Sequence, residues 1–155
     1  MKFYALGAQA VGDFGKNTLM GNYEERPPKV QRFHLELDRW PKDDIVEALA
    51  TYAVTERLAT KLRQSGLTGY SLDRVEITTS LDFEEWRSLH ASEILPKFYW
   101  LKVQGSPGVD DFGMVQGPCE LPLIVSEKAM SLLRLYNIAV CDVEDYIPRK
   151  LSATG

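Results

Sequence analysis

The stretch Thr51-Tyr-Ala-Val-Thr-Glu-Arg-Leu-Ala-Thr-Lys-Leu-Arg-Gln-Ser-Gly-Leu67 is matched later in the chain by Pro122-Leu-Ile-Val-Ser-Glu-Lys-Ala-Met-Ser-Leu-Leu-Arg-Leu-Tyr-Asn-Ile138. The two stretches align without a gap. Val-Thr-Glu-Arg lies on Val-Ser-Glu-Lys, and a Leu-Arg pair lies on a second Leu-Arg pair. Each stretch passes from an apolar run into a helical pattern and then into a further apolar run. The sequence therefore predicts two similar strand–helix–strand units.

The ends of the two predicted helices carry matching residues. Thr55 and Ser126 are expected to be N-caps, because a hydroxyl can accept hydrogen bonds from the free amides of the first turn. Gly66 and Asn137 occupy the same place at the other end, and both residue types tolerate the left-handed conformation that ends a helix. Two copies do not make a repeat array. The alternative that each unit is simply a generic capped helix therefore stays open.

Hydrophobic periodicity predicts the other elements. Residues 32–39 alternate, which predicts a half-buried strand with Phe33 on its apolar face and His34 pointing to solvent. Residues 7–29 are rich in Gly and polar residues and are expected to form a long loop, with a short strand over 18–20 left open. Residues 43–52 are ambiguous and have weak helical character. The remaining expectations are strands over 2–6, 70–79, 97–103, 112–115, 121–125 and 138–146, and helices over 55–65, 82–90 and 126–136.

Length and composition are typical of one globular domain. The chain has 155 residues, of which 45% are hydrophobic and 26% are charged. We predict a single α+β domain with a mixed or antiparallel sheet that contains the two similar strand–helix–strand units. Its parts are N-terminal strands and a loop over 1–50, the first unit over 51–79, strands plus the second unit over 95–147, and a polar tail over 148–155.

The net charge of −4 bears on partners. An acidic protein is repelled at long range by nucleic acid and by anionic membranes, so neither is expected as a partner. A local basic helix face formed by Arg57, Lys61 and Arg63 keeps a nucleic-acid binder as a third hypothesis. The chain has no signal-peptide pattern at its N-terminus and no long apolar run, which predicts a cytoplasmic protein. A homodimer is left open.

No reaction signature is present. Cys119, Cys141, His34 and His90 lack the paired spacing of a zinc site, so no metal and no cofactor are expected. The sequence contains none of the usual nucleophile or phosphate-loop motifs. A Cys/His pair is conceivable, but Cys141 follows an apolar run where a thiol is usually inert. His90 is expected to interact with a helix C-terminus. We expect a non-enzyme, and a small enzyme or ligand-binding domain with a carboxylate or Cys/His site is the alternative.

Three short segments combine acids with a large aromatic residue. Aromatic residues are enriched at protein interfaces, and acidic rims steer basic partners. These segments are therefore candidates for a binding face. The alternative for each is an aromatic residue in the core beside solvated acids. The candidate residues are Asp82, Glu84, Glu85 and Trp86 in the first segment, Asp110, Asp111 and Phe112 in the second, and Glu144, Asp145 and Tyr146 in the third.

Four segments resemble a bacterial immunity-protein family of polymorphic toxin systems. They are Leu95-Pro-Lys-Phe-Tyr-Trp-Leu-Lys-Val103, Asp110-Asp-Phe-Gly113, Leu123-Ile-Val-Ser-Glu-Lys-Ala129 with its helix and Asn137, and Ser65-Gly-Leu-Thr-Gly69. The resemblance covers roughly residues 50–147. It implies a small cytosolic antidote that binds a cognate toxin domain and blocks its active site or its access to substrate. It carries over no catalytic residue. Asp110, Asp111, Ser126 and Glu127 match the family pattern, and helix capping already explains the last two.

Overall fold

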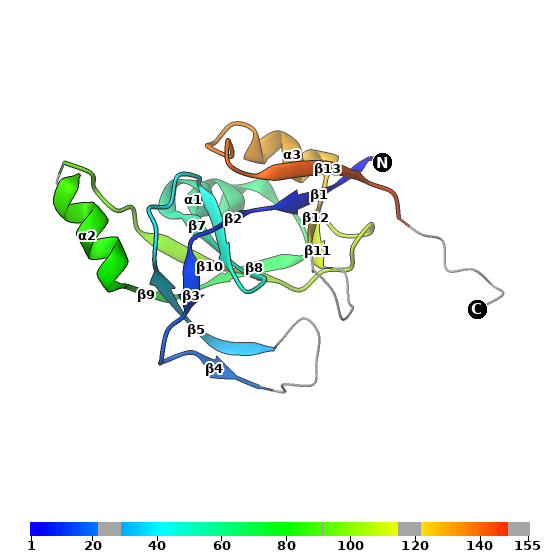
Figure 1. Cartoon of the computed structure of the whole chain (residues 1–155). Coiled ribbons are helices and arrows are strands. Elements are labelled where there is room, and N and C mark those ends of the chain that lie inside the picture. Colours follow the sequence, from blue (N-terminus) through cyan, green and yellow to red (C-terminus); the bar gives the residue numbers. More distant parts are fainter. Residues whose placement is uncertain (22–28, 91, 115–121, 149–155) are drawn as a thin grey trace.

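The computed structural model describes residues 1–21, 29–90, 92–114 and 122–148, and its elements confirm the α+β class (Figure 1). The helices are α1 (Glu56–Ser65), α2 (Leu81–Leu89) and α3 (Glu127–Leu133). The strands are β1 (Phe3–Gly7), β2 (Gln9–Ala10), β3 (Gly12–Phe14), β4 (Leu19–Met20), β5 (Val30–Leu37), β6 (Ile45–Ala48), β7 (Thr51–Thr55), β8 (Tyr70–Asp73), β9 (Val75–Thr79), β10 (Phe98–Val103), β11 (Phe112–Met114), β12 (Leu123–Ser126) and β13 (Asp142–Tyr146).

Two of the sheets have the same strand order. Sheet A runs β11-β12-β1-β13, and sheet B runs β6-β7-β10-β8 with β2 added beside β6. In each sheet a hairpin leads into a helix, α3 after β12 and α1 after β7. The predicted likeness of the two strand–helix–strand units therefore extends to the whole surrounding sheet. We call β1, β6, β7, α1 and β8 the first half, and β10, β11, β12, α3 and β13 the second half.

The two halves exchange their first strands. β1 lies between β12 and β13 of the second half, whereas β10 lies between β7 and β8 of the first half. The exchanged strands have related sequences, Lys2-Phe-Tyr-Ala-Leu6 and Lys97-Phe-Tyr-Trp-Leu101. Their contacts also correspond, because Lys2 and Lys97 each accept a hydrogen bond through the backbone carbonyl from the first amide of a helix, at 2.9 Å in both cases. Neither half can complete its sheet without the other.

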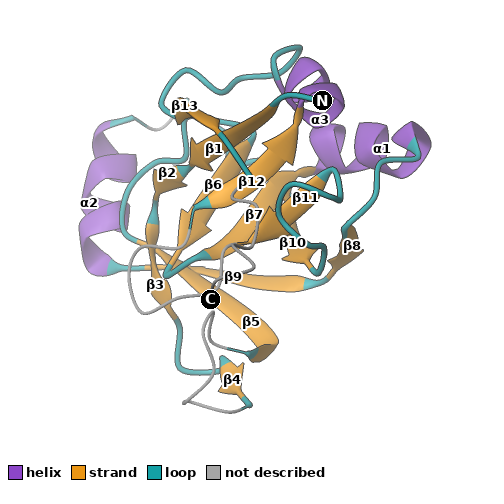
Figure 2. Ribbon diagram, turned by 90° about the vertical axis from the view of Figure 1, so that its right-hand side faces the viewer, coloured by secondary structure: helices purple, strands orange, loops and turns teal. Residues whose placement is uncertain are grey.

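The core between these sheets is covered by α1 and α3 (Figure 2). Both helices bury one face, because their apolar residues recur at helical spacing. Leu58 and Leu62 of α1 and Ala129 and Leu133 of α3 are inaccessible or nearly so. They pack on buried side chains of β1, β7, β10 and β12.

A further sheet, sheet C, covers the opposite face of sheet B. In it β5 pairs with β3 and β4 in antiparallel fashion and with β9 in parallel fashion. A second core cluster lies here, in which Phe33 and Trp100 meet edge to face at 5.9 Å between ring centroids. Trp100 stands where the related strand β1 has the small Ala5. Phe83 of α2 is buried in the same cluster.

Several element predictions were wrong in their bounds. Residues 43–52 are not helical but form β6 and the start of β7, joined by a tight turn at Leu49-Ala50. Residues 70–79 form two strands that break at Arg74, and β13 begins only at Asp142. The predicted loop over 7–29 contains β2 and β3, whereas β4 agrees with the short strand left open over 18–20. Cys119 and the other residues of 115–121 lie outside the described residues.

The predicted caps are confirmed at Ser126 and Gly66 but differ at Thr55 and Asn137. Ser126 is an N-cap whose hydroxyl accepts from the amide of Ala129, as expected, but the hydroxyl of Thr55 accepts no capping hydrogen bond. Gly66 takes the left-handed conformation that ends α1, with φ of 72°. Asn137 does not, because α3 already ends at Leu133. Asp44 contacts both places, since it binds the Thr55 hydroxyl and the Asn137 backbone.

The prediction that His34 points to solvent was wrong. His34 is 2% exposed, because β9 and the β3–β4 turn cover both sides of β5. Its Nδ1 accepts from the amide of Asn17 at 3.1 Å, which places the ring proton on Nε2 facing the Thr78 hydroxyl at 2.7 Å. The described helices include none that is both long and apolar enough to cross a membrane.

The β6–β7 turn generates a stability prediction. Leu49 and Ala50 have φ values of 47° and 58°, a conformation that costs about 1 kcal/mol or more for residues with a Cβ. The double substitution Leu49→Asn with Ala50→Gly introduces the residue types preferred in such turns. It is expected to raise the free energy of unfolding by about 1–2 kcal/mol. Urea unfolding measures this change, and an unchanged or lower midpoint contradicts it. Gln64→Asn is the control, because it introduces an asparagine on the exposed face of α1, outside any turn.

Candidate functional site

Asp44 connects the start of α1 to the segment that follows α3. Its side chain is buried, and one carboxylate oxygen accepts from the Thr55 hydroxyl at 2.5 Å and from Arg57 Nε at 2.7 Å. The other accepts from Arg57 Nη2 at 2.6 Å and from the amide of Asn137 at 2.7 Å. Its backbone amide also donates to the carbonyl of Asn137. This carboxylate is therefore fully engaged inside the protein.

Asp111 has the same role in the other half. Its carboxylate accepts from the Ser126 hydroxyl at 2.5 Å and from the amide of Thr68 at 2.9 Å. Its backbone carbonyl accepts from the amide of Ser126, as that of Asp44 does from Thr55. Each aspartate thus joins the N-terminus of its own helix to the segment that follows the other helix.

The electrostatics of the two aspartates agree with this engagement. Burial by itself raises the pKa of Asp44, but hydrogen bonds from Arg57, Thr55 and Asn137 together outweigh it and hold the pKa below its ordinary value of 3.8. Burial also raises the pKa of Asp111, but hydrogen bonds from Ser126 and Thr68 outweigh it, and this pKa is lowered as well. Both groups are stable anions in the folded protein.

Asp43 holds the segment before β13. Its Oδ2 accepts from the amides of Val140 and Cys141 and from the Cys141 thiol at 3.3 Å. Its Oδ1 is buried and has no hydrogen-bond partner among the described residues. Burial, and then the neighbouring Asp43 carboxylate, raise the pKa of the Cys141 thiol to about 12. The thiol is therefore neutral, which is the opposite of an activated nucleophile.

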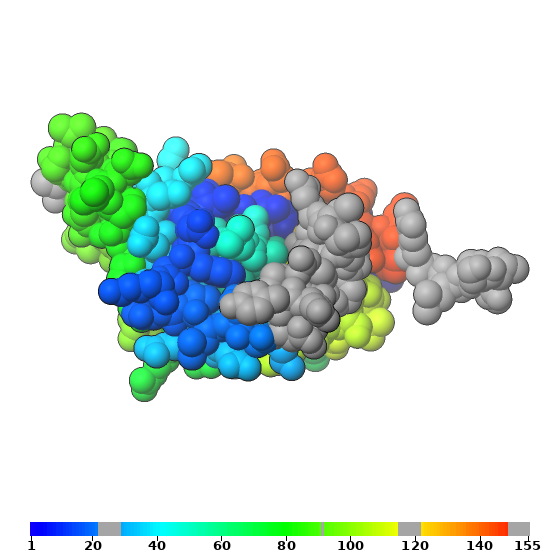
Figure 3. Space-filling view, turned by 60° about the horizontal axis from the view of Figure 1, so that its bottom comes forward, coloured from blue at the N-terminus to red at the C-terminus, as the bar shows by residue number. Residues whose placement is uncertain are grey.

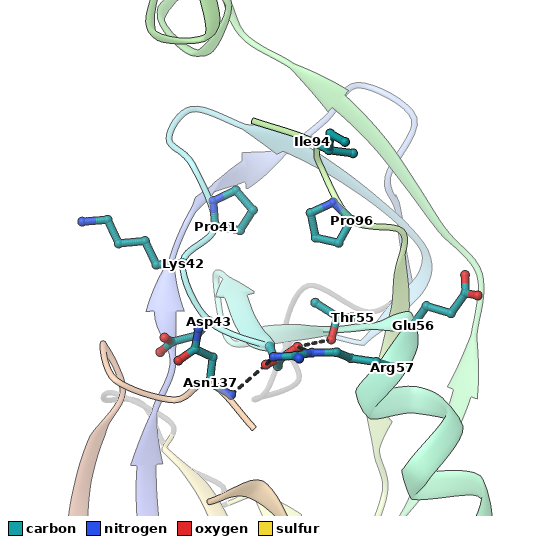
Figure 4. A pocket seen from close by; sticks show the side chains of 10 residues that line it. Pro41, Lys42, Asp43, Thr55, Glu56, Arg57, Ile94, Pro96 and Asn137 are labelled. Carbon is teal, nitrogen blue, oxygen red and sulfur yellow. Dashed lines mark hydrogen bonds and ion pairs between the residues drawn. The ribbon is translucent and has the colours of Figure 1, made fainter. Parts of the chain in front are cut away.

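A pocket opens beside the Asp44–Arg57 pair (Figure 4). Its volume is about 340 Å³. Pro41 and Pro96 lie on opposite sides of it and Ile94 lies beyond them, while Thr55 and Arg57 form the other end. Lys42, Glu56 and Asn137 complete the lining together with the two aspartates. The lining therefore combines an apolar wall with a charged one.

Aromatic rings of α2 stack on Trp40, the residue that precedes Pro41 of the pocket. Trp40 stacks on Phe83 at 5.7 Å and on Trp86 at 5.3 Å, and His90 stacks on Trp86 at 3.8 Å between ring centroids. This stack attaches α2 to the segment that leads into Pro41. In the space-filling view α2, in green, protrudes from the rest of the molecule (Figure 3).

Large apolar side chains are exposed on and after α2. Leu81 is 86% exposed, Leu89 82% and Ile94 87%. We call residues 81–90 and 92–96 the α2 segment. Exposed apolar residues that gather in one segment are typical of interaction sites. Asp82 and Glu85, on the same segment, have exposed carboxylates with no partner among the described residues.

The structure separates the three predicted acidic–aromatic clusters. Asp82, Glu84, Glu85 and Trp86 lie on α2 at one end of the molecule, and Glu144, Asp145 and Tyr146 lie on β13 away from it (Figure 1). Asp110 accepts from the amide of Ser106 in a turn. Asp111 is held by Ser126 and Thr68, and Phe112 is fully buried. For Phe112 the alternative of a core aromatic beside acids is the correct one.

The sequence did not indicate the residues that form the pocket. Pro41 and Ile94 carried no motif, Pro96 was noted only within the segment 95–103 of the family resemblance, and Arg57 only in the matched units and as part of a basic helix face. The two histidines and Cys141 lie in different surroundings, with His34 on Thr78, His90 on Trp86 and Cys141 on Asp43. Within the described ranges, no three His, Cys, Asp or Glu side chains form a group that could hold a metal ion.

Removal of the Asp44 carboxylate is expected to destabilise the fold. In Asp44→Asn, Arg57 and the buried Thr55 hydroxyl lose their charged acceptor, and the free energy of unfolding at pH 7 is expected to fall by about 2 kcal/mol or more. Because the folded pKa is lowered, the unfolded chain takes up the proton first. The stabilisation is thus present above pH 3.8 and is lost as the pH falls through the lower folded pKa.

Urea unfolding of the wild type and Asp44→Asn, from pH 7 down to pH 3, measures both effects. The difference between the two proteins is expected to shrink at the acid end. Asp73→Asn is the control, because Asp73 forms an exposed ion pair with Lys102. A difference that stays constant with pH contradicts the role given to Asp44.

The raised pKa of Cys141 predicts slow alkylation. At pH 8 almost no thiolate is present, so iodoacetamide is expected to modify Cys141 at least about a hundredfold more slowly than an exposed cysteine introduced by Ser92→Cys. Peptide mass spectrometry after timed quenching measures both rates in one sample. Asp43→Asn removes the neighbouring charge and is expected to speed the reaction. Equal rates at the two cysteines would show that Cys141 is not shielded.

Comparison with known proteins adds nothing to the contacts described above. No protein-family model, no curated protein and no solved structure matches this chain.

Proposed function

We propose that this protein is an immunity-like protein of the bacterial cytoplasm that binds and neutralises a toxin domain. The resemblance of four segments within residues 50–147 to an immunity family suggests this class. The observation that carries the proposal is the exposure of Leu81, Leu89 and Ile94 in the α2 segment. Covering such side chains with a partner removes apolar surface from water and stabilises the complex.

The position of the α2 segment in the fold supports a binding role. It lies between β9 and β10, and no element of the second half corresponds to it within the described residues. The sheets and helices that the two halves share do not need it. Trp40 and Phe83 nevertheless anchor it through ring stacking, so the exposed residues are presented on a fixed support. A fixed support lowers the entropy cost of association.

Charge indicates what kind of partner fits. Asp82, Glu84 and Glu85 are exposed on α2, and the chain as a whole has a net charge of −4. Acids around an apolar patch steer a basic partner and raise the association rate. A toxin domain with a basic face around its active site, as needed for an anionic substrate, matches this surface.

Three of the groups that a carboxylate or Cys/His site would use are engaged in contacts inside the protein. Asp44 and Asp111 are saturated by internal hydrogen bonds, and the thiol of Cys141 is neutral. This favours the binding role over the alternative of a small enzyme with a carboxylate or Cys/His site. The local basic face around Arg57 is likewise reduced, because Arg57 is paired with Asp44.

The proposal predicts which surface substitutions abolish binding. Leu89→Glu is expected to weaken binding of the toxin domain encoded by the adjacent upstream gene at least about tenfold, since it places a charge in the apolar contact. Asp82→Lys with Glu85→Lys is expected to slow association and to reduce its dependence on salt. Isothermal titration and stopped-flow kinetics measure these effects, and growth on co-expression reports neutralisation.

Two matched controls carry the same change elsewhere. Val109→Glu and Ile147→Glu also replace apolar residues that are 79% and 82% exposed, next to the other two predicted clusters. They are expected to bind normally. Loss of binding in either control with normal binding in Leu89→Glu would move the interface away from α2. No complex and no rescue with the wild type would refute the proposed function.

A further inference from the structure

The pocket of Figure 4 continues the α2 segment. Ile94 and Pro96 belong to both, so a partner that covers the exposed Ile94 also reaches the mouth of the pocket. Pockets at interfaces typically receive a single large side chain, and such anchors contribute most of the binding free energy. The volume of about 340 Å³ is at the lower end of the roughly 300–1,000 Å³ range of ligand pockets, which suits one side chain better than a large cofactor.

The guanidinium of Arg57 is fixed in place at the charged wall. Its Nε and Nη2 donate to Asp44, and its side chain is still 64% exposed. One face of the guanidinium lies over the ring of Tyr136 at 5.5 Å. Nη1 donates to no acceptor among the described residues. The exposed part of the group is thus held ready for a further contact without a loss of side-chain entropy.

The ionised residues around the pocket nearly cancel. Lys42 and Arg57 are positive, while Asp43, Asp44 and Glu56 are negative. Two positive and three negative groups leave a net charge of −1, and Arg57 and Asp44 are already paired with each other, so no charged guest meets a wall of purely opposite charge. A neutral side chain meets neither repulsion nor the desolvation cost of its own charge. Among neutral side chains, an aromatic ring is the one that gains from both a proline wall and a guanidinium.

We propose that this pocket receives one aromatic side chain of the protein partner, packed against Pro41 and Pro96 and in contact with the guanidinium of Arg57. The biological role of the site rests on the proposed function, but the affinity of the pocket for an aromatic group does not. The second half offers a comparison, because Lys128 stands there in the place of Arg57 and makes no such paired contact with Asp111 in the described part of the chain.

The test uses small probes, so that it does not depend on the toxin. N-acetyltryptophanamide, N-acetylargininamide and N-acetylaspartamide are titrated into the intact protein while the methyl signals of Ile94 and Thr55 are followed by NMR. Saturable shifts are expected with the tryptophan probe, and none or much weaker ones with the two charged probes. A stronger response to either charged probe, or no saturable response to any, overturns the inference.

Variants locate the contact. Arg57→Lys keeps the charge but loses the planar group, and it is expected to weaken the tryptophan probe about three- to tenfold. Pro96→Asp is expected to abolish the shifts. Lys128→Ala is the matched control and should bind the probe as the wild type does. Arg57→Lys also loses a hydrogen bond to Asp44, so the amide spectrum of this variant must be unchanged away from the pocket. Pro96→Asp tests the site while leaving the Arg57–Asp44 pair intact. An unchanged affinity in both pocket variants overturns the inference.

The same variants are then tested with the toxin domain of the neighbouring gene. Failure of the two proposals can be told apart here. If the wild type binds the toxin and Pro96→Asp binds it equally well, the pocket is not the anchor and the proposed function stands. If the tryptophan probe binds and the toxin does not, the pocket inference stands and the proposed partner is wrong.

Discussion

The fold depends on two aspartates, the buried Asp44 and the half-buried Asp111, that connect the halves crosswise. Asp44 joins the start of α1 to the segment after α3, and Asp111 joins the start of α3 to the segment after α1. The exchanged strands β1 and β10 add a second connection of the same kind. Because the sheets, helix starts and loop exits of this arrangement are supplied by both halves, neither half is complete alone. This explains how a chain of 155 residues holds two helices of ten residues or fewer in fixed positions.

The features that distinguish one half from the other lie together. Sheet C covers sheet B, and Trp100 replaces the small Ala5 to fill the space between them. The α2 segment follows β9 of the same sheet, and the pocket lies where that segment returns to β10. The shared parts of the halves serve as a scaffold, while the unshared α2 segment carries Leu81, Leu89 and Ile94, three of the exposed apolar side chains. A surface of this kind can change its partner without disturbing the crosswise hydrogen bonds, because Leu81, Leu89 and Ile94 take no part in them.

Two physical properties suit the unshared surface to binding a protein. The aromatic stack from Phe83 through Trp40 to Trp86 fixes α2, so little entropy is lost when a partner covers it. Acids next to exposed leucines would attract the proposed basic partner at long range without being buried themselves. Arg57 combines two roles, since its pairing with Asp44 both closes the scaffold and positions a donor at the pocket. One ion pair therefore links stability to the candidate site.

Local patterns in the sequence were enough for the starts of the helices, for the alternating strand β5 and for the aromatic strand β10, because these features follow from periodicity and end residues within a few positions. They were not enough for the β6–β7 hairpin, whose Leu49-Ala50 turn lacks the Gly or Asn that marks such turns. The burial of His34, the hydroxyl of Thr55 turned toward Asp44, and the pocket were decided only by tertiary structure. Each depends on segments far apart in the chain, such as Pro41, Arg57, Ile94 and Asn137, and no local pattern records which distant side chain supplies a hydrogen bond or a wall.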